Sequence, residues 1–244
     1  MAQGLIFFAV PHEAKPFLRR ARKAGLPVAR RSPSLPSIVA EASVGPHHVV
    51  VSGMGQARAL AAANAAMEST EAEWVLTCGF AGALDPGLQV GDVLHDADPW
   101  FPLGLASRDT GSRPARFACS PRVAVTRHDK ARLRDESHAD AVEMESGVIR
   151  DLCLARATPS ATLRVVSDAA GEDLPFDFNA LLTPSHDIHA GRMAWAIARA
   201  PWKVASLMGF QRRVSFAARR LAEAAVMIIA GTPERSAPTL VAPT

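Results

Sequence analysis

Short apolar runs alternate along this chain with segments of helical character, and this alternation most restricts the fold. The expected strands are residues 4–10, 47–53, 74–82, 90–97, 115–120 and 163–169, and the expected helices are residues 13–24, 57–69, 129–136 and 143–155. Strands separated by helices of this length form βαβ units, in which neighbouring strands run parallel. We therefore expect an α/β fold with a central mixed, largely parallel sheet flanked by helices.

The order of these segments indicates one domain followed by extra helices. The chain has 244 residues, and α/β folds of this length often form a single domain. We expect a core over residues 1–189, basic amphipathic helices over residues 190–231 and a disordered tail over residues 232–244. Within the core, residues 101–116 are predicted to form a polar surface loop, and residues 174–189 to be irregular.

The composition excludes several classes of protein. Hydrophobic residues make up 48% and charged residues 21% of the chain, which is ordinary for a globular protein. The net charge of +3 is mild and no basic tract is interleaved with aromatic residues, so we expect no nucleic-acid partner. The three cysteines form no CxxC pair, so neither a disulfide framework, a zinc site nor another metal is expected, and the compartment is predicted to be reducing. The first apolar run is too short to span a bilayer.

Two turns rich in small residues follow expected strands. The first is SGMGQARA, in which Gly53 and Gly55 let the backbone approach a ligand, and the second is TCGFAGAL, which contains Phe80, Ala81 and Gly82. In open parallel sheets, ligands bind beyond the carboxyl ends of the strands. Both turns are predicted to border one crevice, although a plain strand-to-helix turn explains either of them alone.

Two other segments carry acidic residues, one where a helix is expected to begin and one at the end of an expected strand. AVEMESGVI carries Glu143 and Glu145 on either side of Met144, where a helix is expected to begin, and VVSDAAG ends a strand with Ser167 and Asp168. Acidic residues in a first helical turn complement the helix dipole, and a Ser-Asp pair after a strand is typical of a turn or cap. Capping alone therefore accounts for these residues unless other segments point to the same place.

The order and spacing of the segments do point to the same place. Together they resemble the purine nucleoside phosphorylase and uridine phosphorylase superfamily, in particular its nucleosidase branch, which cleaves methylthioadenosine and S-adenosylhomocysteine. The resemblance covers roughly residues 4–180 and is carried by AVPHEA, SGMGQARA, TCGFAGALDPGLQVGDV, AVEMESGVI and RVVSDAA. The joint pattern is far more specific than any one segment.

The resemblance implies an active site. Glu13 and Asp168 would be the catalytic residues, with Glu13 activating the incoming water and Asp168 sharing a proton with the purine. Glu145 would bind the ribose hydroxyls and Met144 would lie along the sugar. The other residues implied in binding or orienting the substrate are Glu143, Ser167, Phe80, Ala81, Gly82, Arg164 and Gly53. The resemblance implies no cofactor, and a homodimer or a higher homo-oligomer.

The chemistry of N-glycosidic cleavage agrees with these roles. Breaking the bond builds positive charge on the ribose ring, so a carboxylate beside the sugar stabilises the transition state more than the ground state. Adenine leaves poorly as an anion, and an acid at the purine can supply a proton to N7. Three carboxylates around one nucleoside therefore predict an enzyme rather than a non-catalytic nucleoside-binding module, which we keep as a second hypothesis.

One departure from the superfamily bears on the acceptor of the ribosyl group. Its phosphorylases hold phosphate with an arginine just before the TCGG-like stretch, whereas this chain has WVLTCGFAG with no arginine. A phosphate dianion without such a clamp is costly to desolvate. We therefore favour water as acceptor, while Arg164, Arg108, Arg113 and Arg116 remain alternative phosphate ligands.

The C-terminal region suggests a contact with a membrane surface. Apolar residues at helical spacing, together with many basic residues, indicate amphipathic helices; the apolar positions are Leu207, Phe210, Val214, Leu221, Ala225 and Ile228. Such helices either pack on the core or lie on a membrane. Trp195, Trp202, Phe210 and Phe216 would suit an interface.

Two segments extend the resemblance to a particular branch. LPFDFNALL and GRMAWAIARAPW resemble the hopanoid-associated phosphorylase branch, which implies adenosylhopane as substrate, a nucleoside with a triterpenoid at its 5′ carbon. Trp100, Phe101, Leu103 and Leu105 are further candidates to shield such a lipid. This implies a cytoplasmic protein at the inner face of the membrane. The alternative is a soluble methylthioadenosine or S-adenosylhomocysteine nucleosidase.

Overall fold

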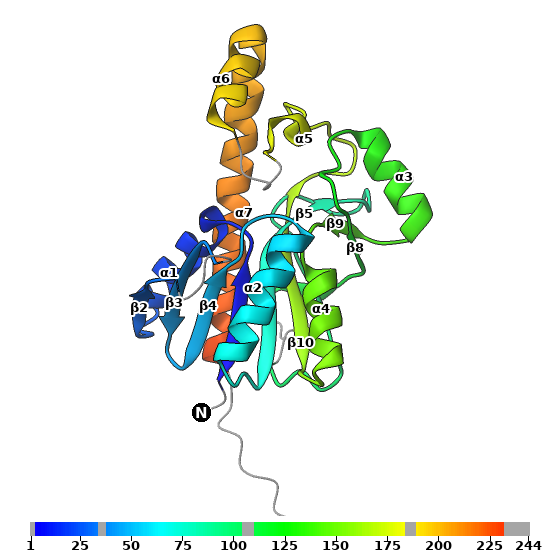
Figure 1. Cartoon of the computed structure of the whole chain (residues 1–244). Coiled ribbons are helices and arrows are strands. Elements are labelled where there is room, and N and C mark those ends of the chain that lie inside the picture. Colours follow the sequence, from blue (N-terminus) through cyan, green and yellow to red (C-terminus); the bar gives the residue numbers. More distant parts are fainter. Residues whose placement is uncertain (1–2, 34–37, 104–109, 184–188, 232–244) are drawn as a thin grey trace, which may run out of the picture.

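The fold is described from a computed structural model, which covers residues 3–33, 38–103, 110–183 and 189–231. Its centre is a mixed, largely parallel sheet (Figure 1) with the strand order β2-β3-β4-β1-β5-β10-β6-β7. The strands on this path are β1 (Gly4–Phe8), β2 (Val28–Arg31), β3 (Ala40–Val44), β4 (His47–Val51), β5 (Trp74–Ala83), β6 (Val93–Ala97), β7 (Ser112–Pro114) and β10 (Ser160–Asp168). The central strands β4, β1, β5 and β10 run parallel, as the alternation predicts.

Helices cover both faces of the sheet. The helices are α1 (Pro11–Lys23), α2 (Gln56–Ser69), α3 (Arg127–Ser137), α4 (Ser146–Ala155), α5 (Phe178–Leu181), α6 (Ala190–Arg199), the 3-10 helix η1 (Pro201–Lys203) and α7 (Val204–Ala230). Helices α1 and α7 pack together on one face, and α2 and α4 pack together on the other. The α/β fold class predicted from the sequence is therefore confirmed.

The alternating side chains of β1 show how the two layers form. Ile6 and Phe8 point into the cluster with α1 and α7, whereas Leu5 and Phe7 point into the cluster with α2 and α4. Side chains of successive strand residues face opposite sides of a sheet, so a strand buried on both faces reads as one continuous apolar run. The alanines of α2 allow that helix to pack closely on the sheet.

Helix α7 belongs partly to the core. Its second half is buried against α1 and β10 through residues that include Leu221, Ala225 and Ile228. Its first half continues past the sheet and, together with α6, projects from the body of the molecule (Figure 1). The second half of α7 therefore stabilises the fold, whereas the first half of α7 and helix α6 border the space beyond the edge of the sheet.

Several local expectations are wrong. The helix predicted from residue 143 begins at Ser146, because residues 141–143 form a strand, β9 (Ala141–Glu143), that pairs with β5 and with β8 (Phe117–Cys119). The edge strand β2 and its neighbour β3 were not predicted, because their exposed or polar residues mask the apolar pattern. The segment 101–116 contains the edge strand β7, and its Phe101 packs edge-on against Trp74 in the core.

The projecting helices expose large apolar side chains. Trp195 is 62% exposed, Trp202 74% and Met208 52%. Over the described ranges, no helix combines the length and the apolar character that a bilayer span requires. The predicted disordered tail, residues 232–244, and the predicted apolar residue Leu105 lie outside the described residues.

Candidate active site

A cavity of about 390 Å³ lies beyond the carboxyl ends of β1, β5 and β10, where open parallel sheets bind ligands. Of the residues that the sequence predicted for the site, its lining includes Glu13, Phe80, Ala81, Gly82, Glu143, Met144, Glu145, Ser167 and Asp168. Arg164 and Gly53 do not line it. Side chains from four distant parts of the sequence thus meet in one space.

Glu13 lies at the first turn of α1 and joins that helix to the sheet. Its Oε2 accepts hydrogen bonds from the backbone N–H of Ala9 (3.0 Å) and Val10 (3.1 Å). Its Oε1 accepts one from Phe80 N–H (2.9 Å), and the side chain is 4% exposed. A carboxylate oxygen can accept two hydrogen bonds, so Oε1 keeps capacity for one more donor, such as a water.

Asp168 is directed into the cavity by an irregularity of β10. The register between β10 and β5 shifts between Val166 and Asp168, which is a β-bulge, and bulges commonly re-aim a side chain beside an active site. Ser167 Oγ donates to Asp168 Oδ1 at 2.6 Å. The absence of a side chain at Gly82 makes room, since a Cβ there would lie 3.1 Å from Asp168 Oδ2.

The sequence analysis missed a buried lysine behind Asp168. Lys130, on α3, is 1% exposed, and its Nζ lies 2.5 Å from Asp168 Oδ2. Nothing in the sequence around Lys130 predicts this contact, because Asp168 lies 38 positions away along the chain. It does not line the cavity, so any effect it has on a ligand passes through Asp168.

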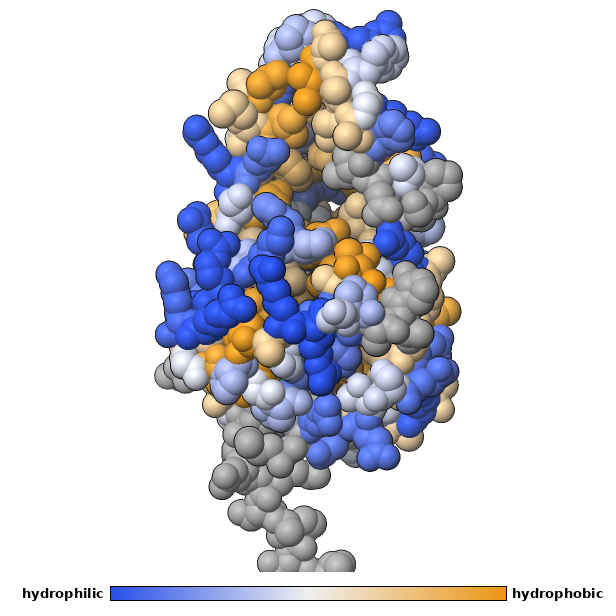
Figure 2. All heavy atoms as spheres, turned by 60° about the vertical axis from the view of Figure 1, so that its left-hand side comes forward, coloured by the Kyte–Doolittle hydropathy of each residue, from blue (hydrophilic) through white to orange (hydrophobic). Residues whose placement is uncertain are grey.

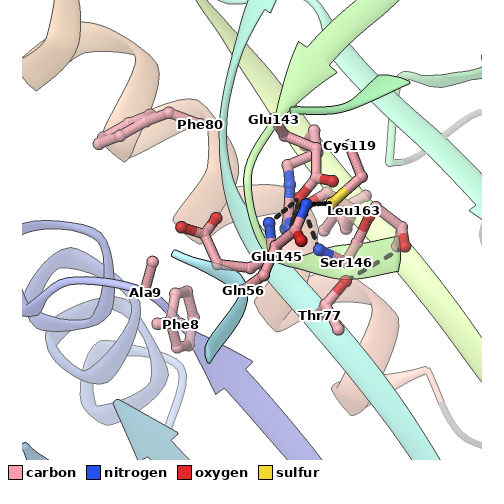
Figure 3. Close-up of polar contacts among 12 residues, drawn as sticks. Phe8, Ala9, Gln56, Thr77, Phe80, Cys119, Glu143, Glu145, Ser146 and Leu163 are labelled. Carbon is pink, nitrogen blue, oxygen red and sulfur yellow. Dashed lines mark hydrogen bonds and ion pairs between the residues drawn. The ribbon is translucent and has the colours of Figure 1, made fainter. Parts of the chain in front are cut away.

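The two glutamates of the AVEMESGVI segment have different local roles. Glu143 Oε2 accepts hydrogen bonds from the backbone N–H of Glu145 (3.0 Å) and Ser146 (2.7 Å). Glu143 therefore caps α4, which is the structural role that its position in the sequence suggested. Glu145 makes no capping bond; its Oε1 accepts from Gly55 N–H at 2.8 Å. Figure 3 shows Glu143, Glu145 and Ser146 converging beside Gln56 and Cys119. Capping therefore explains Glu143 in part and Glu145 not at all.

The SGMG turn positions Glu145 rather than offering Gly53 to a ligand. Gly53 and Gly55 have φ values of 88° and 91°, in the left-handed region that favours glycine. A Cβ on Gly53 would lie 2.3 Å from the side chain of Arg58, which packs over it. Met54, between the two glycines, does line the cavity. The turn thus places one N–H on Glu145 and one thioether in the cavity wall.

Arg164 lies under the carboxylates. It is 2% exposed, and its guanidinium donates to Glu143 Oε2 at 2.6 Å. Its charge also acts on Glu13, whose pKa it lowers, and both side chains border Gly79, where a Cβ would lie 3.0 Å from Glu13 Oε1 and 3.3 Å from an Arg164 nitrogen. The side chain is thus engaged by the carboxylates and does not face the cavity.

Burial and the charges of this cluster shift the pKa values of its carboxyl groups in different directions. Burial raises the pKa of Glu13, and its backbone hydrogen bonds and Arg164 offset this only in part. Burial acts in the same direction on Glu143, but the charge and hydrogen bond of Arg164, together with two backbone N–H bonds, outweigh it and hold the pKa of Glu143 below its usual range. Burial, followed by the charge of Glu143, raises the pKa of Glu145 to about 7. The cluster therefore combines a carboxylate that stays ionised with two groups that hold protons more firmly.

The raised pKa of Glu145 predicts a pH-dependent stability. Between pH 4.5, its ordinary pKa, and about 7, the folded chain holds a proton that the unfolded chain has lost, so this group's contribution to stability falls as pH rises. Glu145→Gln, which cannot ionise, should therefore gain stability over the wild type by roughly 1–2 kcal/mol at pH 8 but little at pH 4.5. Urea unfolding at both pH values measures this, and an equal difference at the two would contradict it.

The structure also shows lining residues that the sequence analysis did not assign to the site. Most of the apolar ones come from α5, its flanking segments and α7, namely Leu174, Phe178, Leu182, Phe210 and Val214, and Val10 precedes α1. Phe178 and Phe210 contact each other, with ring centroids 5.7 Å apart. His12 and Arg122 are polar additions to the wall. The apolar pattern of residues 207–228 predicted an amphipathic helix but could not show that its first half borders a cavity.

The alternative phosphate ligands do not meet in this cavity. Arg113 forms an ion pair with Asp92 at 2.5 Å, and Arg116 is exposed; neither lines the cavity, and Arg108 lies outside the described residues. Of the described arginines, Arg122 alone lines it. Among those same residues, no group of three or more His, Cys, Asp or Glu side chains is arranged to hold a metal ion.

Comparison with known proteins agrees with the geometry. Residues 5–95 match the family model of the phosphorylase superfamily. The chain is 27% identical over 165 residues to a 5′-methylthioadenosine/S-adenosylhomocysteine nucleosidase of Marinomonas. This match covers 54% of this chain and 71% of that protein. It is 28% identical over 178 residues to the aminodeoxyfutalosine nucleosidase of Campylobacter jejuni, covering 59% and 78%.

A solved structure shows that the likeness extends over the whole fold. The futalosine hydrolase of Helicobacter pylori superposes with a TM-score of 0.67 and 19% identity, over 94% of this chain and 97% of that chain. The match includes the C-terminal region that the family model does not reach. The chain therefore has a nucleoside phosphorylase-like fold and is similar in sequence to nucleosidases.

Proposed function

We propose that this protein is an N-ribosyl hydrolase that releases adenine from a 5′-substituted 5′-deoxyadenosine. The observation that supports this most is the convergence of Glu13, Glu145 and Asp168, from three distant segments, in one largely apolar cavity. The similar proteins named above are nucleosidases. A binding module without turnover would have no use for buried carboxyl groups with separated pKa values, and such groups are costly to keep.

Each carboxyl group has a role in this reaction. Asp168 supplies a proton to purine N7 as the bond to the sugar breaks, so that adenine leaves as a neutral base. Glu145 accepts hydrogen bonds from the ribose hydroxyls, and its negative charge stabilises the positive charge that develops on the ring. Glu13 accepts a proton from the attacking water through the free acceptor capacity of Oε1.

Water is the proposed acceptor. Arg164 is engaged by the carboxylate of Glu143 and does not line the cavity. We expect the sugar product to be the free ribosyl compound, with a rate that added phosphate does not raise. Mass analysis of the products with and without phosphate measures this. A ribose 1-phosphate product would contradict the assignment and would direct attention to Arg122.

The proposed 5′ substituent is a lipid, with adenosylhopane as the specific candidate. The cavity wall opposite the sheet is formed by Phe178, Leu182, Phe210 and Val214, which carry no polar group. The same helices continue to exposed apolar residues at the projecting end of the molecule. Apolar surface removed from water contributes about 25 cal/mol for each Å², so a lipid tail would gain along this path. A short thioether substituent, as in methylthioadenosine, needs only the inner part of the wall.

We place the protein at the inner face of the membrane, in contact through α6 and the start of α7. The exposed Trp195 and Trp202 suit the interface between water and lipid. Removal of residues 202–244 would be a poor test of this contact, because the second half of α7 is buried in the core. Substitution of exposed side chains avoids that problem.

Trp195→Ser with Trp202→Ser should lower turnover of an adenosine carrying a bilayer-embedded lipid, while sparing a 5′-methylthio analogue in solution. Both residues lie outside the cavity, so the loss should appear only where the membrane is part of the substrate. Adenine release from the two substrates, measured with the same two preparations, gives the comparison. Equal losses on both substrates would show that the helices only stabilise the fold. Wild-type activity on the soluble analogue but not on the lipid-linked substrate would favour the methylthioadenosine nucleosidase alternative.

A further inference from the structure

A basic groove runs between α1 and α7 beside the active-site cavity. It has a volume of about 430 Å³ and is lined by five cationic side chains, which are Lys15, Arg19, Arg20, Lys23 and Arg219. Figure 2, which brings the side with α1 forward, shows a dense group of hydrophilic residues below the apolar projecting end of the molecule. Sequence analysis did not single out α1 as basic, because its cations are spaced among apolar residues.

The cations of this groove have no ion-pair partner among the residues that the structure describes. Within the described ranges, none of the five cations forms an ion pair, and the one acidic residue in the lining, Glu223, pairs with Arg220 at 3.6 Å. Like charges that converge in one groove repel each other and attract anions. His12 lines both this groove and the active-site cavity, so the two spaces share a wall.

We propose that this groove binds the phosphate groups of anionic membrane lipids and holds the mouth of the active site against the membrane. Lysine and arginine are the side chains that bind phosphate, and they attract proteins to anionic lipid surfaces. The exposed apolar residues of α6 and α7 lie beyond the groove at the projecting end, which is the arrangement of a surface that inserts apolar groups and keeps cations at phosphate level. This inference rests on the proposed function, to which it adds a binding site for lipid phosphate.

The test is co-sedimentation of the full chain with vesicles of phosphatidylglycerol and phosphatidylcholine, at low and high salt. Lys15→Gln, Arg19→Gln and Lys23→Gln together should weaken binding at low salt by about tenfold or more. The matched control removes three exposed cations elsewhere, Arg127→Gln, Arg132→Gln and Arg156→Gln, and should bind like the wild type. Thermal melts establish that both variants are folded. The measurement does not use turnover, so it can fail while the proposed reaction stands.

Three outcomes would overturn the groove's assignment. Equal losses in the two triple variants would show only a dependence on net charge, and equal binding to vesicles of phosphatidylcholine alone would show that phosphatidylglycerol is not recognised. Displacement by inorganic phosphate beyond the effect of sodium chloride at the same ionic strength would identify a free phosphate as the ligand. The expected result is displacement that depends on ionic strength alone.

A second inference rests on the buried Lys130 behind Asp168. Its ammonium group has three N–H donors, and each has an acceptor: Asp168 Oδ2 at 2.5 Å, the carbonyl oxygen of Ala169 at 2.7 Å and that of Glu172 at 2.9 Å. The start of α3 is itself fixed by a capping box, in which Thr126 and Asp129 bond each other's backbone N–H. A lysine held in this way cannot turn towards a ligand.

We infer that Lys130 is a positioning residue for the acid at the purine, on the basis of the proposed reaction. Ser167 orients one oxygen of Asp168 and Lys130 the other, so the carboxyl group has one fixed direction in the cavity. When Asp168 passes its proton to purine N7, its carboxylate gains a negative charge 2.5 Å from the ammonium, which stabilises that charge as it forms. Lysine itself transfers no proton in this step.

A double-mutant cycle tests this role. Lys130→Met should lower kcat for adenine release by about 10²-fold, with a smaller change in KM. The same substitution in an Asp168→Asn background should lower kcat less than about threefold further, because Lys130 acts through the carboxylate. The double variant also leaves no buried carboxylate without a partner, so it should melt at a higher temperature than Lys130→Met alone.

The cycle separates a positioning role from a structural one. Losses in kcat that multiply in the double variant would show that Lys130 supports the fold rather than Asp168, and a folded Lys130→Met variant with full kcat would also overturn the inference. Lys130→Arg, which keeps the cation, should recover part of the rate. If the wild type itself releases no adenine, the proposed function has failed, which is a different result from either of these.

Discussion

Asp168→Asn should lower the rate of adenine release by about 10²–10⁴-fold, the usual contribution of a general acid. An amide has no proton to give to purine N7, so adenine would have to leave as an anion. The variant should keep the fold, since the amide oxygen can still accept from Lys130 or from Ser167. Steady-state assays of free adenine, together with a melting curve, measure both properties.

Asp151→Asn is the matched control, because Asp151 is exposed on α4 and lies outside the cavity. It should be as active as the wild type. If Asp168→Asn melts cooperatively and loses less than about tenfold in rate, the acid at the purine is another group.

Glu13→Gln should strongly lower turnover while adenine still binds. The carboxyl group accepts three backbone N–H bonds, from Ala9, Val10 and Phe80, and its remaining acceptor capacity is proposed to take the proton of water. A glutamine has one acceptor oxygen and would turn its own N–H groups towards one side of this set, so we expect a loss of about 10²-fold or more in kcat and a lower melting temperature.

Binding separates the chemical effect of Glu13→Gln from a general collapse of the site. Isothermal titration with adenine should give an affinity close to that of the wild type, because the purine is placed at Asp168. Glu136→Gln, at an exposed position of α3, is the matched control for the substitution itself. Full activity in folded Glu13→Gln would place the base elsewhere, and loss of adenine binding would mean that the whole site had been disturbed.

The sequence predicts the centre of the fold better than its edges. The strands β1, β4, β5 and β10 are buried almost throughout, on both faces of the sheet, and each contains a short apolar run that the sequence shows. The edge strand β2 reads VARR, which is mostly exposed, and nothing in that pattern distinguishes it from a loop. The helix expected over residues 143–155 begins only at Ser146, because pairing with β5 and β8 makes residues 141–143 a strand.

The candidate site shows the same division. Residues in the segments that carry the family resemblance, such as Glu13, Glu145 and Asp168, were predicted from that resemblance and do line one cavity. Residues that enter through tertiary packing were not: Lys130 reaches Asp168 from a separate helix, and Phe210 reaches the cavity from α7. Arg164 was predicted to orient substrate groups, and its strand position could not reveal that Glu143 holds it beneath the cavity.

Release of adenine by the purified full chain tests the central claim most directly. The protein is incubated with 5′-deoxyadenosine derivatives whose 5′ substituents range from methylthio to a polycyclic lipid, the latter in vesicles, and free adenine and the sugar product are quantified together. We predict one adenine for each free ribosyl product, with activity lost in Asp168→Asn and kept in Asp151→Asn. Absence of adenine from every derivative, or equal release by the wild type and Asp168→Asn, would contradict the account.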